Sequence, residues 1–206
     1  MTQFNVLATP ETVTATINTL SEHGFLPELL DNGVAAFNRI KELIPAGASV
    51  MNGSSRTLTE IGYIDYLKAG EHGWNNVHES ILKETDPVKQ AALREQSVIS
   101  DYYLGSVHAL TATGQLLIAS GSGSQLPHIV YTSKNLIFVV STQKIVADLN
   151  TAHERLTDYV YPLEDQRMKD ANMGGSVITY VLTVNSEPSW KNRKIHILLV
   201  NEKLGF

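Results

Sequence analysis

Two short stretches of small polar residues are the parts of this 206-residue chain best suited to holding a ligand. Glycine lets a backbone approach a ligand closely, so that consecutive N–H groups can point into one concavity and bind an anion. Serine hydroxyls add further hydrogen-bond donors. The stretches NGSS and SGSGSQ therefore predict a site for a carboxylate, a phosphate or a phosphorylated cofactor, with the candidate ligand-binding residues Asn52, Gly53, Ser54, Ser55, Ser120, Gly121, Ser122, Gly123, Ser124 and Gln125.

The same stretches also have a purely structural interpretation. Gly/Ser turns connect strands to helices in many proteins, and a serine or threonine caps a helix without any ligand. SGSGS matches neither the Walker pattern nor the dinucleotide-binding pattern G-x-G-x-x-G. The two interpretations differ in one respect, which is whether both turns face the same cleft.

Two titratable residues are expected near these turns. His108 lies in a predicted strand and is a weak candidate for an acid or base, although a half-buried histidine with a backbone partner is the commoner outcome. Lys144 follows the apolar run LIFVV and could neutralise an anionic ligand, although a solvated lysine is at least as common. A nucleophilic role for Ser54 or Ser122 has no support, because the sequence has no G-x-S-x-G elbow.

Charged residues later in the chain have simpler interpretations. Glu164, Asp165 and Arg167 are expected to be surface or helix-end charges. The seven histidines include no H-x-x-x-H or H-x-H pair, so no metal site is predicted.

Helices and strands alternate along the chain and would position these residues. The run 25–30 fits either a short edge strand or a continued helix. The alternation of helices and strands predicts an α/β fold with a largely parallel sheet flanked by helices, in which ligands bind beyond the carboxyl ends of the strands. The expected helices are 10–23, 32–44, 57–70, 147–159 and 162–171, with a further helix that starts at Asp86 and Pro87, and the expected strands are 49–51, 106–111, 116–120, 136–140, 177–184 and 195–201.

The whole chain, 1–206, is expected to form one domain with a helical excursion around 71–100. This excursion is charged and weakly amphipathic, and Asp86 followed by Pro87 is a strong helix start. We expect it to cover a site or a partner subunit, and a homo-oligomer is a possible assembly.

Composition excludes several classes of function. With 21 acidic and 16 basic side chains the net charge is −5, and no basic run is present to track the phosphates of a nucleic acid. The absence of cysteine excludes disulfides and any iron–sulfur cluster held by the chain's own thiols. The N-terminus lacks the pattern of a signal peptide, and the apolar runs are too short to cross a bilayer. These features predict a soluble, cytoplasmic protein without a membrane partner.

Several blocks of the sequence together resemble the LUD-domain family, of the lactate-utilisation protein C type, formerly a domain of unknown function. The blocks span nearly the whole chain: VMNGSSRTLTEIGYIDYLK, SDYYLGSVHALTATGQLLIASGSGSQLP, TQKIV, YPLEDQRM and LVNEKLGF. The resemblance implies a fold like that of the glucosamine-phosphate isomerase, ribose-phosphate isomerase and CoA-transferase group (NagB/RpiA/CoA-transferase-like). It also implies an association with L-lactate oxidation alongside iron–sulfur partner proteins.

The sequence departs from the family in one motif. Many members carry A-E-T-G-T where this chain has LTATGQ, so that Ala112 replaces the acid and Gln115 the second threonine. Three functions stay open. The first is a LUD-type protein that binds a small anionic or phosphorylated ligand, with its cofactor unknown. The second is an isomerase- or transferase-like enzyme acting on a sugar phosphate or CoA thioester. The third is a non-catalytic accessory subunit of an iron–sulfur lactate-oxidising complex.

Overall fold

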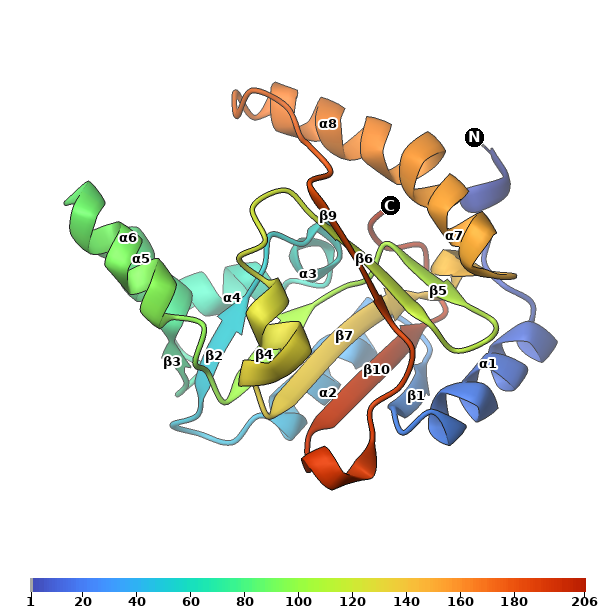
Figure 1. Ribbon diagram of the computed structural model, residues 1–206. Helices are drawn as coiled ribbons and strands as arrows, with labels where there is room; N and C mark the ends of the chain where they lie inside the picture. Colours follow the sequence, from blue (N-terminus) through green and yellow to red (C-terminus); the bar gives the residue numbers. More distant parts are fainter. Residues whose placement is uncertain (1) are drawn as a thin grey trace.

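The computed structural model describes residues 2–206 and contains two sheets (Figure 1). The larger sheet has six strands, all parallel to their neighbours. Their spatial order is β1 (Leu26–Leu30), β10 (Lys194–Val200), β7 (Asn135–Ser141), β4 (Tyr102–Gly105), β2 (Ser49–Asn52) and β3 (Asn75–Asn76). The predicted α/β fold with a largely parallel sheet and flanking helices is thus confirmed, and the run 25–30 provides the edge strand β1.

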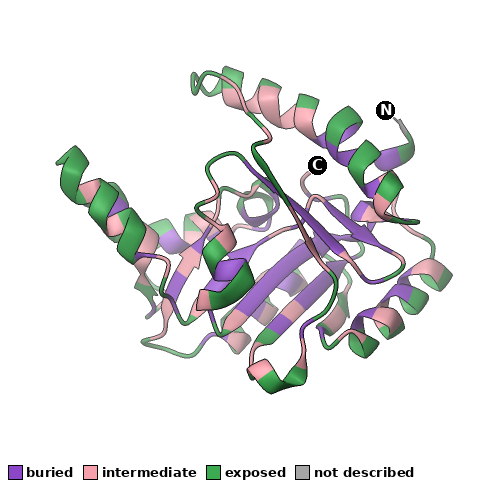
Figure 2. Cartoon of the chain, viewed as in Figure 1, coloured by how far each residue is buried: buried purple, intermediate pink, exposed green. Residues whose placement is uncertain are grey.

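The central strands are apolar on both faces because both faces are covered (Figure 2). Along β7, Ile137 and Val139 belong to one apolar cluster, whereas Leu136 and Phe138 belong to the other. This alternation follows from the two-residue period of a strand. One face packs against α2 (Gly33–Leu43), α3 (Arg56–Glu60) and α4 (Tyr63–Ala69).

The other face is covered by α1 (Pro10–Glu22) and by a second sheet, which the sequence did not predict. Its order is β8 (Ile145–Val146), β5 (Ala109–Thr111), β6 (Leu116–Ser120) and β9 (Tyr180–Val184). The β5–β6 and β6–β9 pairs are antiparallel, and the β5–β8 pair is parallel. The predicted hairpin at 106–120 and the predicted strand 177–184 therefore form a layer of their own.

The predicted helix caps are found in the structure, whereas the predicted helix boundaries differ from it in two places. Thr9 caps α1 and Asn32 caps α2 through side-chain oxygens that accept backbone N–H groups. The helix predicted at 57–70 is broken between α3 and α4, because Gly62 has a φ of 82°. This angle lies in the left-handed region, which a glycine adopts without steric cost.

The two helices predicted at 147–159 and 162–171 are instead one continuous helical run. It comprises α7 (Leu149–Arg155), the π-helical turn η4 (Leu156–Val160) and α8 (Tyr161–Asp170). Pro162 has no N–H to donate, and the wider turn just before it lets the helix continue without that donor. The predicted break at this proline was wrong for that reason.

Residues 71–100 contain two helices that project from the body as an arm, α5 (Val77–Lys83) and α6 (Pro87–Gln96) (Figure 1). None of the α6 residues is buried. Shorter helical turns are η1 (Thr2–Phe4), η2 (His128–Thr132), η3 (Thr142–Lys144) and η5 (Ser189–Lys191). Within residues 2–206, no helix combines the length and apolar character that a membrane span requires.

Candidate functional site

The structure brings the two Ser/Gly stretches to the same cavity, which has a volume of about 540 Å³. The first stretch follows β2 of the parallel sheet, and the second follows β6 of the smaller sheet. Asn52 and Gly123 do not line the cavity, whereas the other candidates do: Gly53, Ser54, Ser55, Ser120, Gly121, Ser122, Ser124 and Gln125. The polar turns therefore share one cavity although their strands belong to different sheets.

The second stretch uses many of its own donors to hold its shape. The Ser120 hydroxyl accepts the Gly123 amide at 3.0 Å, and the Ser122 hydroxyl accepts the Ser124 amide at 3.4 Å. The Gln125 side chain donates to the Ala119 carbonyl at 2.9 Å. The expected nest of free amides is therefore partly occupied by the turn itself, and what attracts an anion has to lie elsewhere in the cavity.

Some polar groups of the first stretch also form hydrogen bonds that hold the local structure. Ser55 caps α3 by accepting the Leu58 amide at 3.3 Å. Asn52 is 4 % exposed and donates to the Gly53 carbonyl at 3.1 Å. The Gly53 backbone lies against the Tyr103 hydroxyl, and an added Cβ would come within 2.6 Å of that oxygen. Tyr103 in turn donates to Gln125 at 3.1 Å, so one buried tyrosine connects the two stretches.

Lys144 lies in the cavity lining and is only 3 % exposed. Its Nζ atom donates to the Thr57 hydroxyl at 3.1 Å, to the Ser106 hydroxyl at 3.0 Å and to the Val107 carbonyl at 3.3 Å. Among residues 2–206, no carboxylate forms an ion pair with this ammonium group. The alternative of a solvated lysine is therefore wrong.

Burial lowers the pKa of Lys144 to about 7. The nearby Arg155 guanidinium contributes to this lowering of the pKa, and Glu60 opposes it. A charged ammonium is costly in an apolar surrounding unless an anion is paired with it. Lys144 is thus a cation whose charged form an anionic ligand would stabilise.

Arg155 is a second buried cation, and the sequence analysis missed it. It is fully buried on α7, donates to the His108 carbonyl from Nη1, and stacks its guanidinium 5.3 Å from the Tyr159 ring centroid. Its Nε and Nη2 atoms are buried and have no hydrogen-bond partner among the described residues. The spacing of the residues could have indicated its burial, since Arg155 lies three residues after Ala152 and four before Tyr159, on the apolar face of the helix.

His108 lines the cavity together with Lys144, and its carbonyl accepts a hydrogen bond from Arg155, which does not itself line the cavity. Its Nδ1 atom accepts the Ala119 amide at 3.0 Å, so the proton of the neutral ring is on Nε2. Burial lowers the pKa of His108 to about 3, and Lys144 and Arg155 contribute to the same direction. A ring in this state can donate a hydrogen bond from Nε2 but has no free lone pair with which to act as a base.

We predict that His108 remains a neutral Nε2–H tautomer throughout the range from pH 5 to 9. Because its pKa lies below this window, protonation begins only under more acidic conditions. Long-range proton–nitrogen NMR spectra of ¹⁵N-histidine-labelled protein would report the tautomer directly, with the exposed His153 as an internal control. A His108 resonance that titrates near pH 6.5 would refute the assignment.

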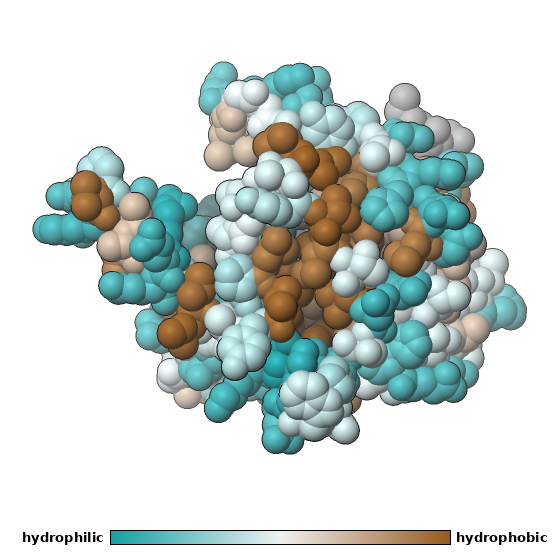
Figure 3. All heavy atoms as spheres, viewed as in Figure 1, coloured by the Kyte–Doolittle hydropathy of each residue, from teal (hydrophilic) through white to brown (hydrophobic). Residues whose placement is uncertain are grey.

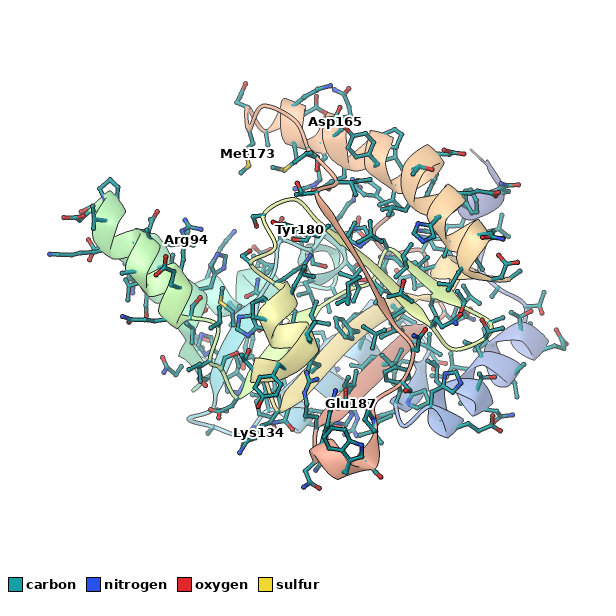
Figure 4. The ribbon with its side chains drawn as sticks, in the orientation of Figure 1. Arg94, Lys134, Asp165, Met173, Tyr180 and Glu187 are labelled. Carbon is teal, nitrogen blue, oxygen red and sulfur yellow. The ribbon has the colours of Figure 1, made fainter. Side chains whose placement is uncertain are left out.

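The opposite side of the cavity is formed by η4, α8 and the segment that leads into β9. In Figure 4, Asp165 on α8, Met173 in the following loop and Tyr180 at the start of β9 mark the course of this segment. The Asp165 carboxylate accepts the Ser176 amide at 2.8 Å, which ties the segment back to α8. The apolar side chains that line this side are Leu156, Val160, Tyr161, Met168, Val177 and Ile178.

Glu164 also lines the cavity, so the interpretation of this residue as only a surface or helix-end charge was incomplete. Its carboxylate accepts two hydrogen bonds from Arg167, at 2.6 and 2.7 Å. Arg167 also reaches the Ser54 hydroxyl at 3.4 Å. This contact links α8 to the first polar stretch across the cavity.

The motif that departs from the family lies away from the cavity. Residues 112–115 form the turn between β5 and β6, at the end of β6 opposite to Ser120, and none of them lines the cavity. The arm α5–α6 contributes no lining residue either, so it does not cover this site.

Comparison with known proteins gives a family and a fold. The sequence profile described as "LUD domain" matches residues 13–200. A search of curated proteins found no match. Among solved structures, a DUF162 family protein from Deinococcus radiodurans has 12 % sequence identity and a TM-score of 0.56, over 95 % of this chain and 100 % of that chain.

Proposed function

Because the chain belongs to the LUD-domain family, we propose that it binds a small anionic or phosphorylated ligand in the cavity between its two Ser/Gly stretches. The proposal places this binding in cytoplasmic organic-acid utilisation, in keeping with the family's association with lactate oxidation. Partner proteins that carry iron–sulfur clusters would supply the redox chemistry, since this chain has no cysteine.

The observation that supports the proposal is a buried cation in the cavity wall, Lys144, that has no counter-ion among the described residues. Lys144 is 3 % exposed and forms no ion pair with any described residue. Arg155, behind the lining, is 0 % exposed and also forms none, but it does not itself line the cavity. Burying an uncompensated charge costs several kcal/mol, about 3–5 kcal/mol when one partner of a pair is missing. An anion in the cavity would offset this cost.

The ligand contacts follow from the groups in the lining. The His108 Nε2–H and the hydroxyls of Ser54 and Ser122 can donate to an anionic oxygen. Of the three Lys144 hydrogen bonds, the longest is the one to the Val107 carbonyl at 3.3 Å. Long hydrogen bonds are weak, so a ligand oxygen would replace this one most easily.

A thermal-shift experiment tests the proposal. Phosphate, L-lactate and longer carboxylates should raise the melting temperature at constant ionic strength, whereas chloride should not. In Gly121→Leu the new side chain starts 3.1 Å from the Val177 carbonyl at the cavity wall and should remove the effect. Ser186→Leu, at an exposed loop position, is the control and should keep it. An unchanged response in Gly121→Leu would place the binding elsewhere.

The affinity for an anion should depend on pH through Lys144. The free protein holds this group with a pKa of about 7, so the ammonium form predominates below that value and anion affinity is constant there. Above pH 7, each further pH unit should weaken binding about tenfold, until the raised pKa of the complex is reached. Calorimetric titration with sulfate, whose own charge is fixed, measures this from pH 5.5 to 9.5. Equal affinity across the range would contradict the role of Lys144.

An isomerase- or transferase-like activity is the second candidate, and Glu164 is the observation that favours it. This carboxylate lies in the cavity wall, where such chemistry needs a general base. Turnover of pentose phosphates or acyl-CoA thioesters that is lost in Glu164→Gln but retained in the Asp158→Asn control would support an enzyme. Binding without turnover of any of these compounds would leave the protein as a ligand-binding subunit.

A further inference from the structure

The cavity has two sides of different chemistry. One side consists of backbone, hydroxyl and charged groups, among them Ser106, His108 and Lys144. The other is formed mainly by aliphatic and thioether groups, among them Val160, Met168 and Val177, together with the Glu164 carboxylate, which is paired with Arg167. Lys144, the unpaired cation required for the proposed anion site, thus lies on one side only, and the anionic group of a ligand would contact only part of the lining.

Apolar groups on the second side are open to solvent. Val177 is 61 % exposed although it lines the cavity, and Tyr180 and Val181, which follow in the same segment, are 49 % and 44 % exposed. Figure 3 shows apolar residues gathered on the face that β9 crosses. A contiguous exposed apolar surface of this kind is characteristic of a binding site.

The cavity is also large for the acid with which the family is associated. Its volume is about 540 Å³. Pockets that hold drug-sized ligands have volumes of roughly 300–1000 Å³. Lactate, with three carbons, would occupy the polar side and leave Met168 and Val177 in contact with water. Met168 is suited to a flexible partner, because its unbranched thioether side chain adapts to the shape of what it contacts.

We infer that the ligand is an amphiphilic anion, a carboxylate or phosphate monoester that bears an unbranched aliphatic chain of about four to eight carbons. The anionic group lies beside Lys144 and His108, and the chain extends across the cavity toward Met168 and Val177. This inference rests on the proposed function, since it assigns the anionic group to the same buried lysine.

A homologous series of ligands tests the inference. Calorimetric titration of the intact protein at pH 6.5 would compare acetate, L-lactate, butyrate, hexanoate and octanoate, all below their micellar concentrations. Each methylene buried in the cavity should tighten binding about fourfold, so hexanoate should bind roughly 200-fold more tightly than acetate. Inorganic phosphate and butyl phosphate form a parallel pair, and 1-hexanol is the uncharged control.

Two substitutions test the contribution of the ligand's aliphatic chain apart from the contribution of its anionic group. Met168→Gln and Val177→Thr alter the apolar side and leave Lys144 and His108 in place. They should therefore reduce the increase in affinity that each added methylene gives, while the affinity for acetate is kept. Val130→Thr changes an exposed valine outside the cavity lining and should leave the series unaltered.

The outcomes distinguish this inference from the proposed function. Equal affinity for acetate, lactate and octanoate would overturn the inference and leave the anion site standing. Equal affinity for hexanoate and 1-hexanol would overturn the anion site as well, because the charge would then contribute nothing. Failure of every carboxylate and phosphate to bind would also overturn both.

Discussion

Replacing Lys144 by methionine is expected to weaken anion binding by a factor of about 100 or more and, at the same time, to stabilise the fold. Anion binding is weakened because the substitution removes the ammonium group from the cavity. A charge-assisted hydrogen bond in a buried site contributes about 1.5–3 kcal/mol to the binding free energy. Stability is gained because an apolar side chain of similar length removes a buried charge without a counter-ion.

The pH dependence of this gain follows from the direction of the pKa change. In the unfolded chain Lys144 has its ordinary pKa of 10.5, and in the folded protein it has a pKa of about 7. Between these values the unfolded state binds the extra proton, so the free energy of unfolding of the natural protein rises with pH through this window. The gain in Lys144→Met is therefore largest below pH 7 and disappears above about pH 10.

At pH 6 the variant should be more stable by about 2 kcal/mol after the loss of three hydrogen bonds, which corresponds to a melting temperature roughly 4–8 °C higher. Calorimetric melting curves at pH 6 and pH 10 measure the difference. Lys134→Met, at an exposed lysine outside the cavity, is the matched control and should change neither property. A variant that is less stable at pH 6, or that binds anions normally, would contradict the account of this site.

The largest loss of stability is expected for Arg193→Met. The Arg193 side chain donates to the carbonyls of His128, Ile129, Val130 and Ser133 at 2.8–3.1 Å and to the Glu187 carboxylate at 3.3 Å. It is 6 % exposed and Glu187 is 4 % exposed. Removing it leaves a buried carboxylate and several carbonyls without their donor.

Breaking a buried pair by removing one partner costs about 3–5 kcal/mol, so the melting temperature of Arg193→Met should fall by roughly 10 °C. Lys191→Met is the control, because this lysine lies 3.9 Å from the same carboxylate but is 31 % exposed. Its loss should cost under about 1 kcal/mol. Denaturant unfolding measures both. Equal costs for the two variants would show that the carbonyl contacts of Arg193 contribute nothing.

Arg193 also matters for the site, because it connects the loop after β9 to η2, which follows the second polar stretch directly. This connection spans 60 or more residues of sequence. The sequence offered no periodicity or motif to indicate it. The arginine was one of several charges in the linker NSEPSWKNRK.

The fold was predictable where local chemistry decides it. The apolar run around Phe138 predicts a buried strand because interior parallel strands are apolar on both faces. Thr9, Asn32 and Asp86 predict helix starts because their side chains accept the first free amides, as the structure shows. These signals lie within a few residues of the elements that they determine.

The rest of the fold depends on contacts between distant segments. β6 is fully buried, and its sequence does not state whether it pairs within the parallel sheet or with β9 in a separate sheet. The break expected at Pro162 is absent because the preceding residues widen into a π-helical turn. Propensity alone favours ending the helix there.

The candidate site was predicted in part for the same reason. The two Ser/Gly stretches and Lys144 were recognisable by residue type and by their position after strands, and they line one cavity. That the turn amides bind within the turn itself, as the Gly123 amide does to Ser120, depends on geometry that composition does not reveal. Arg155 was not predicted because it lies on the apolar face of a helix, and the apolar pattern of that face assigns no role to a single charged residue.

A crystal structure with 6-bromohexanoate tests the central claim most directly, because difference density places the carboxylate and anomalous scattering places the bromine. We predict the carboxylate within hydrogen-bond distance of Lys144 or His108 and the bromine beside Met168 and Val177. A bromine peak outside this cavity, or a cavity that stays free of the compound at saturating concentration, would contradict the claim that a buried lysine and an apolar wall together form the ligand site.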